Sequence, residues 1–267
     1  MTEPRVLVEI DGPVAYVTLN RPDKLNGIDL DTIDELIAAA SSLKADRNIR
    51  AVILQGKGRS FCAGLDFAGA FAEKKRVARY FFAGPRMVNR FQRVNQVWTQ
   101  LPVPVIAVVH GHCYGAGVQL AACADVRFTT PDAAWAILEA KWGLVPDMGG
   151  TPSFNELMPT DVLMRLAMTG ETVTGARAVE LGLATEFSDD PLQAALAFVD
   201  QIVERSPDSV AATKRLVHGT RHAGLRRTYR LERRLQGAMF KARNTAIARK
   251  AGAAKEKPEF GPRTFKP

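Results

Sequence analysis

Short apolar and alternating runs along the first two-thirds of the chain predict buried strands. Val6 to Ile10 and Val14 to Leu19 flank Asp11-Gly12-Pro13, which predicts a hairpin. Four further runs have the length of strands: Ala51 to Leu54, Val105 to Val109, Asp125 to Thr129, and Ala134 to Leu138. Glycine-bearing or turn-forming segments separate these runs, as at Asn20-Arg21-Pro22-Asp23 and Lys57 to Asp66.

Apolar residues at helical spacing occupy most of the remaining chain. Asp31 is expected to cap a helix that runs to about Leu43, and Phe67 to about Thr99 is expected to be mostly helical with a break near Gly84-Pro85. After a turn at Gly111 to Gly115 we expect a helix from Ala116 to about Ala124, and Gly143 to Gly150 reads as a loop. The last third is predicted to be helical at Thr160 to Met168, Gly175 to Leu181, Pro191 to Glu204, Pro207 to His218, and Leu225 into Ala251, with an extended tail from Glu256.

Alternating strands and helices followed by helices alone predict an α/β fold with a helical C-terminal layer. The composition changes near residue 200 without an obvious linker. We therefore expect an α/β core over residues 1–200 and a basic helical region over residues 201–267.

The composition is that of an ordinary globular protein, with 46% apolar and 24% charged residues. The three cysteines have no Cys-x-x-Cys spacing, which argues against disulfides and a structural zinc site and favours a reducing cytoplasm. No basic segment followed by an apolar run marks a signal peptide near Met1. The most apolar region, Val103 to Val126, contains polar and glycine interruptions and is not expected to span a membrane.

The net charge of +8 is unevenly distributed. Residues 204–267 hold 17 Lys and Arg against 5 Asp and Glu, a local charge of +12, so the rest of the chain carries −4. Such a basic segment can face nucleic acid, anionic lipid or a phosphorylated small molecule, or it can be a solvated helix face. The sequence leaves these alternatives open.

Two glycine-rich turns follow buried strands. His110 to Gly117 joins a strand to a helix start, where free backbone N–H groups favour negative charge and small residues allow close approach. Ser60 to Asp66 is a second turn of the same kind. Each turn can supply one N–H to a single oxygen, which is the geometry of an oxyanion hole, although tight packing turns have the same composition.

A pair of acids, Glu139 and Asp147, lies in a segment rich in Trp, Leu, Val and Met. Apolar surroundings raise the pKa of a carboxyl group and suit it to proton transfer, whereas a loop acid that faces water would have no such role. His110-x-His112 resembles a metal pair only weakly, so no metal is expected. Cys62 and Cys113 are interpreted as small buried fillers.

Several of these segments together resemble the crotonase superfamily of enoyl-CoA hydratases and isomerases. The resemblance runs in consistent order over residues 5–260 and rests on Arg21 to Asn26, Phe61 to Asp66, Pro104 to Asp125, Gly143 to Thr151, Ser206-Pro207, and the tail Lys257 to Phe260. It implies a spiral of ββα units with a C-terminal helical region that helps to form trimers or dimers of trimers. It also implies an acyl-CoA thioester substrate, in which coenzyme A is part of the substrate and no other cofactor is required.

Carried over by motif, the resemblance makes the backbone N–H groups of Leu65 and Ala116 the oxyanion-hole donors. It places Lys24, Leu25, Ala63, Gly64, Asp66, Phe67 and Gly115 along the substrate and CoA site. It further suggests that the basic C-terminal region contacts CoA phosphates, which favours a small phosphorylated ligand over nucleic acid.

The chain departs from the hydratase pattern at one catalytic position. Hydratases of this family hold a water between two glutamates, and these positions are Gln119 and Glu139 here. An amide cannot act as a general base near neutral pH. Glu139 stands where the family's isomerases keep their proton shuttle, and the spacing from Glu139 to Asp147 resembles the acid pair of dienoyl-CoA isomerases, which also carry an Asp at the Gln119 position.

The sequence therefore predicts an enoyl-CoA or dienoyl-CoA isomerase that uses Glu139 and Asp147. A 2-enoyl-CoA hydratase that uses Glu139 with Gln119 orienting water or substrate is the alternative. A CoA-binding or RNA-binding protein without turnover is an alternative of another class, motivated by the basic C-terminal region.

Overall fold

A twisted sheet forms the centre of the molecule. The computed structural model describes residues 3–82 and 88–266. Within them the main sheet has the order β1-β2-β3-β4-β6-β9, with β1 and β2 antiparallel and the other neighbours parallel. Its strands are β1 Val6–Asp11, β2 Val14–Leu19, β3 Ala51–Gly56, β4 Val105–Val109, β6 Val126–Thr129 and β9 Glu186–Phe187.

A smaller sheet lies beside the main one and has the order β5-β7-β8. It consists of β5 His112–Tyr114, β7 Ala134–Ala136 and β8 Val173–Thr174. The chain alternates between the two sheets, because β4 and β6 belong to the large one while β5 and β7, which follow them, belong to the small one. With β1–β2–α1 and β4–β5–α5, this winding confirms the predicted spiral of ββα units.

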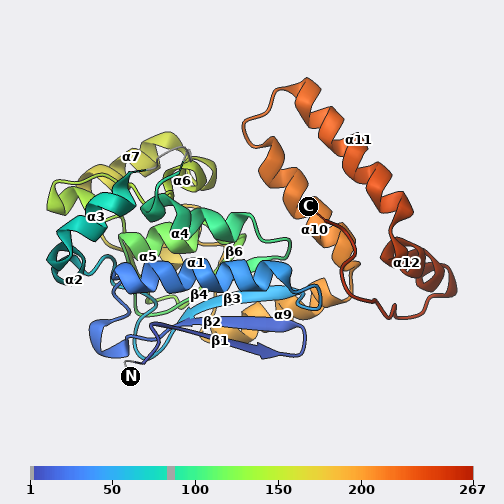
Figure 1. Cartoon of the computed structure of the whole chain (residues 1–267), viewed down its shortest axis with the longest axis horizontal. Coiled ribbons are helices and arrows are strands. Elements are labelled where there is room, and N and C mark those ends of the chain that lie inside the picture. Colours follow the sequence, from blue (N-terminus) through green and yellow to red (C-terminus); the bar gives the residue numbers. More distant parts are fainter. Residues whose placement is uncertain (1–2, 83–87, 267) are drawn as a thin grey trace.

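Helices cover both faces of the main sheet (Figure 1). One face is covered by α1 Leu30–Ala45, α4 Arg90–Thr99 and α5 Ala116–Ala122, and the other by α9 Pro191–Val203. Alternate strand residues serve the two faces: Val52 and Leu54 pack on the first, and Ala51 and Ile53 on the second. The other elements are α2 Phe67–Ala72, α3 Lys74–Phe81, α6 Thr151–Leu157, α7 Thr160–Thr169, α8 Gly175–Glu180, and the 3₁₀ turns η1 Pro22–Lys24 and η2 Glu139–Trp142.

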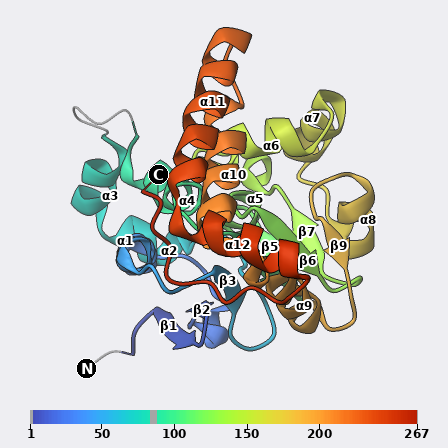
Figure 2. The same ribbon diagram turned by 90° about the vertical axis from the view of Figure 1, so that its right-hand side faces the viewer.

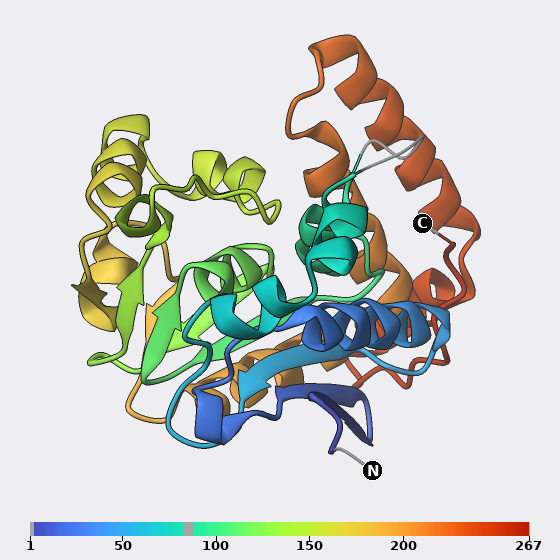
Figure 3. The same cartoon turned by 60° about the vertical axis from the view of Figure 1, so that its left-hand side comes forward.

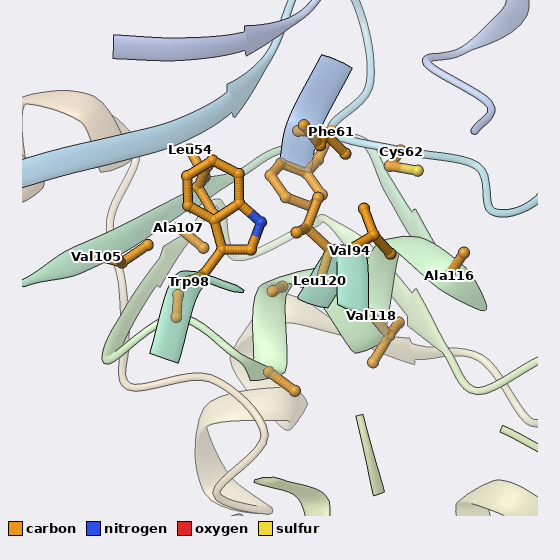
Figure 4. Close-up of a cluster of buried hydrophobic side chains, with 14 of the residues drawn as sticks. Leu54, Phe61, Cys62, Val94, Trp98, Val105, Ala107, Ala116, Val118 and Leu120 are labelled. Carbon is orange, nitrogen blue, oxygen red and sulfur yellow. The ribbon is translucent and has the colours of Figure 1, made fainter. Parts of the chain in front are cut away.

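The hydrophobic core includes the start of α5, the helix that begins at the predicted site. In Figure 4 the Trp98 indole lies beside Leu54, Val105 and Ala107 of the sheet, and the Phe61 ring points toward the helices. Ala116, the first residue of α5, belongs to the same cluster and is 3% exposed. The start of α5 is therefore fixed by core packing.

Three basic helices follow the sheets: α10 Pro207–Thr220, α11 Leu225–Lys241 and α12 Arg243–Ala254. Figure 2 shows α11 rising from the body while the C-terminal tail returns past α12 toward the sheet side. The backbone N–H of Arg263 donates to the Arg47 carbonyl at 3.0 Å, so the end of the tail is attached near the end of α1. Among the described residues, no helix combines the length and the apolarity that crossing a bilayer requires.

Several boundaries differ from the sequence-based expectations. The cap of α1 is Asp29, not Asp31, because the extended Asp29 accepts a hydrogen bond from the Thr32 N–H at 2.8 Å. The predicted turn at Gly111 to Gly115 contains β5, which forms because it pairs with β7. The expected long basic helix is divided at Ala242, which is extended and separates α11 from α12.

Other elements were not predicted at all. The helix α6, the turn η2 and the two-residue strands β8 and β9 fall in segments without a clear periodic pattern. The predicted break at Gly84-Pro85 lies outside the described residues.

Candidate functional site

The two glycine-rich turns lie against each other. The Cys62 N–H donates to the His112 carbonyl at 2.9 Å, and the Tyr114 N–H donates to the Cys62 carbonyl at 2.9 Å. Gly64 adopts φ +102° and a Cβ there would lie 3.1 Å from the Tyr114 carbonyl oxygen, so both the conformation and the close approach require glycine. These hydrogen bonds therefore place the ends of the two turns side by side.

One residue from each turn, Leu65 and Ala116, lines a shared cavity with a backbone N–H that no described strand or helix engages. Ile28 forms a parallel bridge around Leu65: the Ile28 N–H donates to the Gly64 carbonyl, and the Asp66 N–H donates to the Ile28 carbonyl, both at 2.8 Å. In such a bridge the N–H of the central residue points away from the partner strand. Ala116 opens α5, where N–H groups have no intrahelical acceptor. Leu65 and Ala116 therefore form a candidate oxyanion hole.

The cavity between these turns has a volume of about 160 Å³ and an apolar wall. It contains most of the residues predicted for the site, together with several that were not predicted. The residues that line it are Ala63, Gly64, Leu65, Phe67, Gly115, Ala116, Gln119, Leu138, Glu139, Trp142, Leu144, Val145, Asp147 and Met148. In Figure 3 the chain near residues 140–170 and the helices of residues 67–99 stand on opposite sides of α5.

The orientation of the Gln119 amide is fixed by three hydrogen bonds. Its Oε1 accepts the backbone N–H groups of Met148 at 2.9 Å and Gly150 at 3.1 Å. Its Nε2 donates to Oε1 of Glu139 at 2.7 Å. Gln119 is 1% exposed, and a Cβ at Gly150 would lie 2.7 Å from Gln119 Cγ, so the side chain packs closely against the loop. Gln119 therefore acts as a donor toward Glu139 and as an anchor for the loop that carries Asp147.

The Glu139 carboxylate has one engaged oxygen and one unpartnered oxygen. Oε1 accepts from Gln119, whereas Oε2 is buried without a hydrogen-bond partner in the described part of the chain. Burial raises the pKa of Glu139, and the nearby Asp147 carboxylate adds to that rise, while the Gln119 amide opposes it. A buried carboxylate with a free oxygen and a raised pKa is suited to accept a proton from carbon.

Asp147 also lines the cavity and belongs to the loop held by Gln119. Its side chain is exposed at the rim, yet the surrounding protein removes part of its hydration and raises the pKa of Asp147. The site thus contains two carboxyl groups whose environments both favour the protonated form.

Three of the predicted binding residues do not line this cavity: Lys24, Leu25 and Asp66. The Leu25 carbonyl accepts the Ala63 N–H at 2.9 Å, which places residues 24–25 beside the turn. The Asp66 carboxylate accepts from Arg21 at 2.9 Å and from the Gly69 N–H at 3.1 Å, and these contacts lower the pKa of Asp66. In this structure Asp66 is engaged in holding the loop.

The sequence-based prediction missed two kinds of residue. Leu138, Trp142, Leu144, Val145 and Met148 complete the apolar wall, and their signal was the run of large apolar residues around the acid pair. Arg21 and Asn26 support the turn: Arg21 reaches Asp29 and Asp66, and Asn26 Nδ2 donates to the Ser60 carbonyl at 2.7 Å. Both are less than 10% exposed, and this burial could be found only from the fold.

The histidines and cysteines of the two turns have structural contacts. His110 Nε2 donates to the Gly58 carbonyl, and His112 Nδ1 contacts Ser60 Oγ, both at 2.8 Å, so both rings connect the turns. Cys62 and Cys113 are fully buried, as expected for small buried fillers, and burial raises the pKa of the Cys62 thiol to about 12.

Comparisons with known proteins agree with this geometry. Residues 9–263 match the family model described as enoyl-CoA hydratase/isomerase. The chain is 31% identical to a probable enoyl-CoA hydratase of Mycobacterium tuberculosis, over 97% of this chain and 99% of that protein. It is 32% identical to the human mitochondrial Delta(3,5)-Delta(2,4)-dienoyl-CoA isomerase, over 75% of this chain and 64% of that protein.

A similar protein has a solved structure. The crystal structure of an enoyl-CoA hydratase from Mycobacterium marinum has a TM-score of 0.86 and 30% identity, and the match covers 97% of this chain and 99% of that one. Fold, sequence match and the paired glycine turns agree with one another. The chain belongs to the enoyl-CoA hydratase/isomerase family and has the crotonase fold.

Proposed function

We propose that this protein is an acyl-CoA double-bond isomerase that acts on 3-enoyl-CoA or 3,5-dienoyl-CoA thioesters. The observation that carries the proposal is the amide at Gln119, which donates to Glu139 in the place where a second carboxylate would be needed to activate water. The amide oxygen is already occupied by two backbone N–H groups, so Gln119 cannot accept a proton from water.

In the proposed reaction the thioester oxygen lies between the Leu65 and Ala116 N–H groups. Oε2 of Glu139 removes a proton from C2, and the electron pair moves onto the thioester oxygen as an enolate. The two N–H groups stabilise that negative charge. The pair then returns through the carbon chain, the double bond moves to C2–C3, and the carbon at the far end of the conjugated system takes up a proton.

The site can supply the second proton in two ways. For a 3-enoyl thioester, Glu139 returns the proton it has removed at C4. For a 3,5-dienoyl thioester the accepting carbon is C6, and protonated Asp147 is the donor. Partial burial raises the pKa of Asp147, which is the direction that a proton donor requires and supports the second route.

A 2-enoyl-CoA hydratase is the second candidate. The unpartnered Oε2 of Glu139 favours it, since that atom can also hold a water molecule. In this function Gln119 orients the water and Glu139 alone activates it. The residues Lys24, Leu25 and Asp66 remain predicted CoA contacts in both functions. The oligomeric state, the division of the chain near residue 200 and the cytoplasmic location also remain predictions.

The deciding experiment follows the ultraviolet absorbance of the conjugated thioester. The purified protein is mixed separately with 2-enoyl-CoA, 3-enoyl-CoA and 3,5-dienoyl-CoA. We expect absorbance of a double bond conjugated with the thioester carbonyl to increase with the 3-enoyl or the 3,5-dienoyl substrate. Loss of signal from the 2-enoyl substrate alone, with no reaction of the other two, would replace the isomerase by the hydratase.

A further inference from the structure

Large apolar side chains are exposed around the mouth of the cavity. Trp142 is 67% exposed, Leu144 47% and Val145 72%. All three line the cavity, and so does Phe67. We call Phe67, Trp142, Leu144 and Val145 the apolar rim. A contiguous group of exposed large apolar residues is typical of a surface that binds something.

The rim is joined to both parts of the proposed reaction site. Phe67 follows Leu65 by two residues, and its half-buried ring lies 5.4 Å from the Trp142 ring, at an interplanar angle of 41°. Trp142 lies three residues after Glu139 in the 3₁₀ turn η2. Side chains at this spacing in a 3₁₀ turn lie one above the other, about 6 Å apart along the axis. The indole is therefore held one turn from the carboxylate.

The small size of the cavity indicates which part of a substrate meets the rim. A dry cavity of about 150 Å³ holds one benzene-sized group, and this cavity measures about 160 Å³. The thioester carbonyl and its neighbouring carbons fill such a volume. The rest of the thioester then lies outside the cavity, and of its two arms the acyl group, which is apolar whereas the pantetheine arm carries amides, matches the apolar rim.

The rim differs from an ordinary aliphatic surface because two aromatic rings form its centre. Tilted and edge-to-face contacts between rings add stabilisation beyond the burial of apolar area. A third ring that meets the Trp142 indole gains this contribution, whereas a straight alkyl chain gains only burial. The substrate class named below rests on the proposed function.

We propose that the apolar rim binds the distal part of the acyl group and that Phe67 and Trp142 select acyl thioesters ending in an aromatic ring. Binding is measured by calorimetry with two saturated probes of equal carbon number, 6-phenylhexanoyl-CoA and dodecanoyl-CoA. Because both probes are saturated, they can bind without being converted by the enzyme. The measurement therefore holds even if the enoyl isomerisation assay fails, and that assay alone decides the proposed function.

Trp142→Leu and Phe67→Leu keep an apolar side chain and remove the ring. Each is expected to weaken binding of the phenyl probe by about three- to tenfold and to change binding of dodecanoyl-CoA by less than about twofold. Trp142→Phe should retain most of the preference for the phenyl probe. The matched control is Phe240→Leu, which removes an aromatic side chain that is 71% exposed on α11 and does not line the cavity; it should change neither affinity.

Equal losses for both probes would show that the rim binds apolar groups without selecting a ring, and would overturn the choice of substrate class. Unchanged affinities for both probes in the two Leu variants would overturn the rim as the acyl site. Unfolding is monitored by thermal denaturation, and retained dodecanoyl-CoA binding shows that the cavity is intact.

Discussion

The amide of Gln119 and the carboxylate of Glu139 form one unit, joined by a hydrogen bond of 2.7 Å from Nε2 to Oε1. The same amide accepts the N–H groups of Met148 and Gly150, and thereby fixes the loop that holds Asp147. One neutral side chain thus positions both acids of the site. Its identity determines how many carboxylates lie next to the substrate, and so which proton transfers are available.

Replacing Gln119 by Glu should place a second carboxyl group against Glu139. Two carboxylates at this distance cannot both be ionised at low cost, so the pair retains one proton to higher pH. Because Glu139 must be ionised to act as a base, the acidic limb of the kcat/KM profile should move to higher pH. Water addition to a 2-enoyl-CoA should also increase.

The control for this variant is Gln119→Leu, which removes the donor without adding an acid. It should lower kcat because the Glu139 carboxylate loses its positioning partner, but it should add no hydration. A Gln119→Glu protein whose acidic limb does not move would contradict the direct contact between the two side chains. Absence of hydration in both the wild type and Gln119→Glu would remove the hydratase alternative.

The second prediction concerns Glu139 itself. Glu139→Gln should lower isomerisation by about 10²- to 10⁴-fold, because the side chain that accepts the C2 proton no longer can. The measurement is exchange of deuterium from heavy water into C2 of a 3-enoyl-CoA, followed by NMR. Glu232→Gln on α11 removes an exposed carboxylate remote from the cavity and should leave exchange unchanged. Full exchange by Glu139→Gln would exclude the assignment.

Asp147→Asn separates the two substrate classes. It should slow isomerisation of a 3,5-dienoyl-CoA by about 10²-fold or more, since Asp147 donates the proton at C6. Isomerisation of a 3-enoyl-CoA should fall far less, because Glu139 alone moves that proton. Parallel stopped-flow assays with the two substrates test this difference. Equal losses would mean that Asp147 acts through loop structure or through the pKa of Glu139.

Gly64→Ala tests the oxyanion hole. The backbone at Gly64 has φ +102°, and the added Cβ would lie 3.1 Å from the Tyr114 carbonyl oxygen. The turn must shift, which moves the Leu65 N–H, and loss of one such donor lowers kcat by about 10²- to 10³-fold. Gly143→Ala is a comparison at another positive φ, +69°, where a Cβ meets nothing within 4 Å. It should retain far more activity than Gly64→Ala in the same assay.

Strand positions and the two turns could be predicted because their signals are local. Val105 to Val109 is apolar and rich in β-branched residues, which is typical of a buried strand. The glycines that follow indicate a turn, so both the strand and the start of the next helix were predicted correctly. The individual donors, Leu65 and Ala116, were predicted only through the resemblance to the crotonase superfamily, because they carry no distinctive side chain.

The remaining features depend on contacts between distant segments. β5 exists because it pairs with β7, and Ala242 ends a helix although alanine favours helices. Arg21 looks like a surface residue in the sequence, yet it is 9% exposed because Asp29 and Asp66 converge on it. Phe67 was predicted for the substrate site, but its contact with Trp142 was missed because the two rings meet only in the folded chain.

The final prediction concerns the buried charges that attach α10 to the sheet. Lys214 is buried and its ammonium donates to Asp125 at 2.7 Å and to the carbonyls of Trp98 and Val103 at 3.0 and 2.9 Å. The pKa of Asp125 is lowered although burial opposes this, because Lys214, His218 and the Val105 N–H all stabilise its charge. Burial also lowers the pKa of Lys214, so desolvation offsets part of what the pair contributes.

Lys214→Met should therefore destabilise the protein at neutral pH by about 3–5 kcal/mol, since it leaves Asp125 without its ammonium partner. In the wild type, the folded-state pKa of Asp125 lies below its unfolded value, so its stabilisation is present above the unfolded value and is lost as the pH falls through the lowered folded pKa. In the Lys214→Met variant, burial raises the pKa of Asp125. Protonation of Asp125 then removes the free-energy cost of a buried, unpaired charge. The stability difference between the two proteins should thus narrow from pH 7 to pH 4.

Urea denaturation at both pH values measures this difference. Arg177→Met breaks an exposed pair with Glu180, in which both side chains are more than half exposed, and should cost no more than about 1 kcal/mol. If Lys214→Met loses as little unfolding free energy as the Arg177→Met control, or if its loss does not decrease at low pH, the buried pair does not hold α10. A large and pH-dependent cost would make Asp125 and Lys214 the main polar attachment of the basic helices to the sheet.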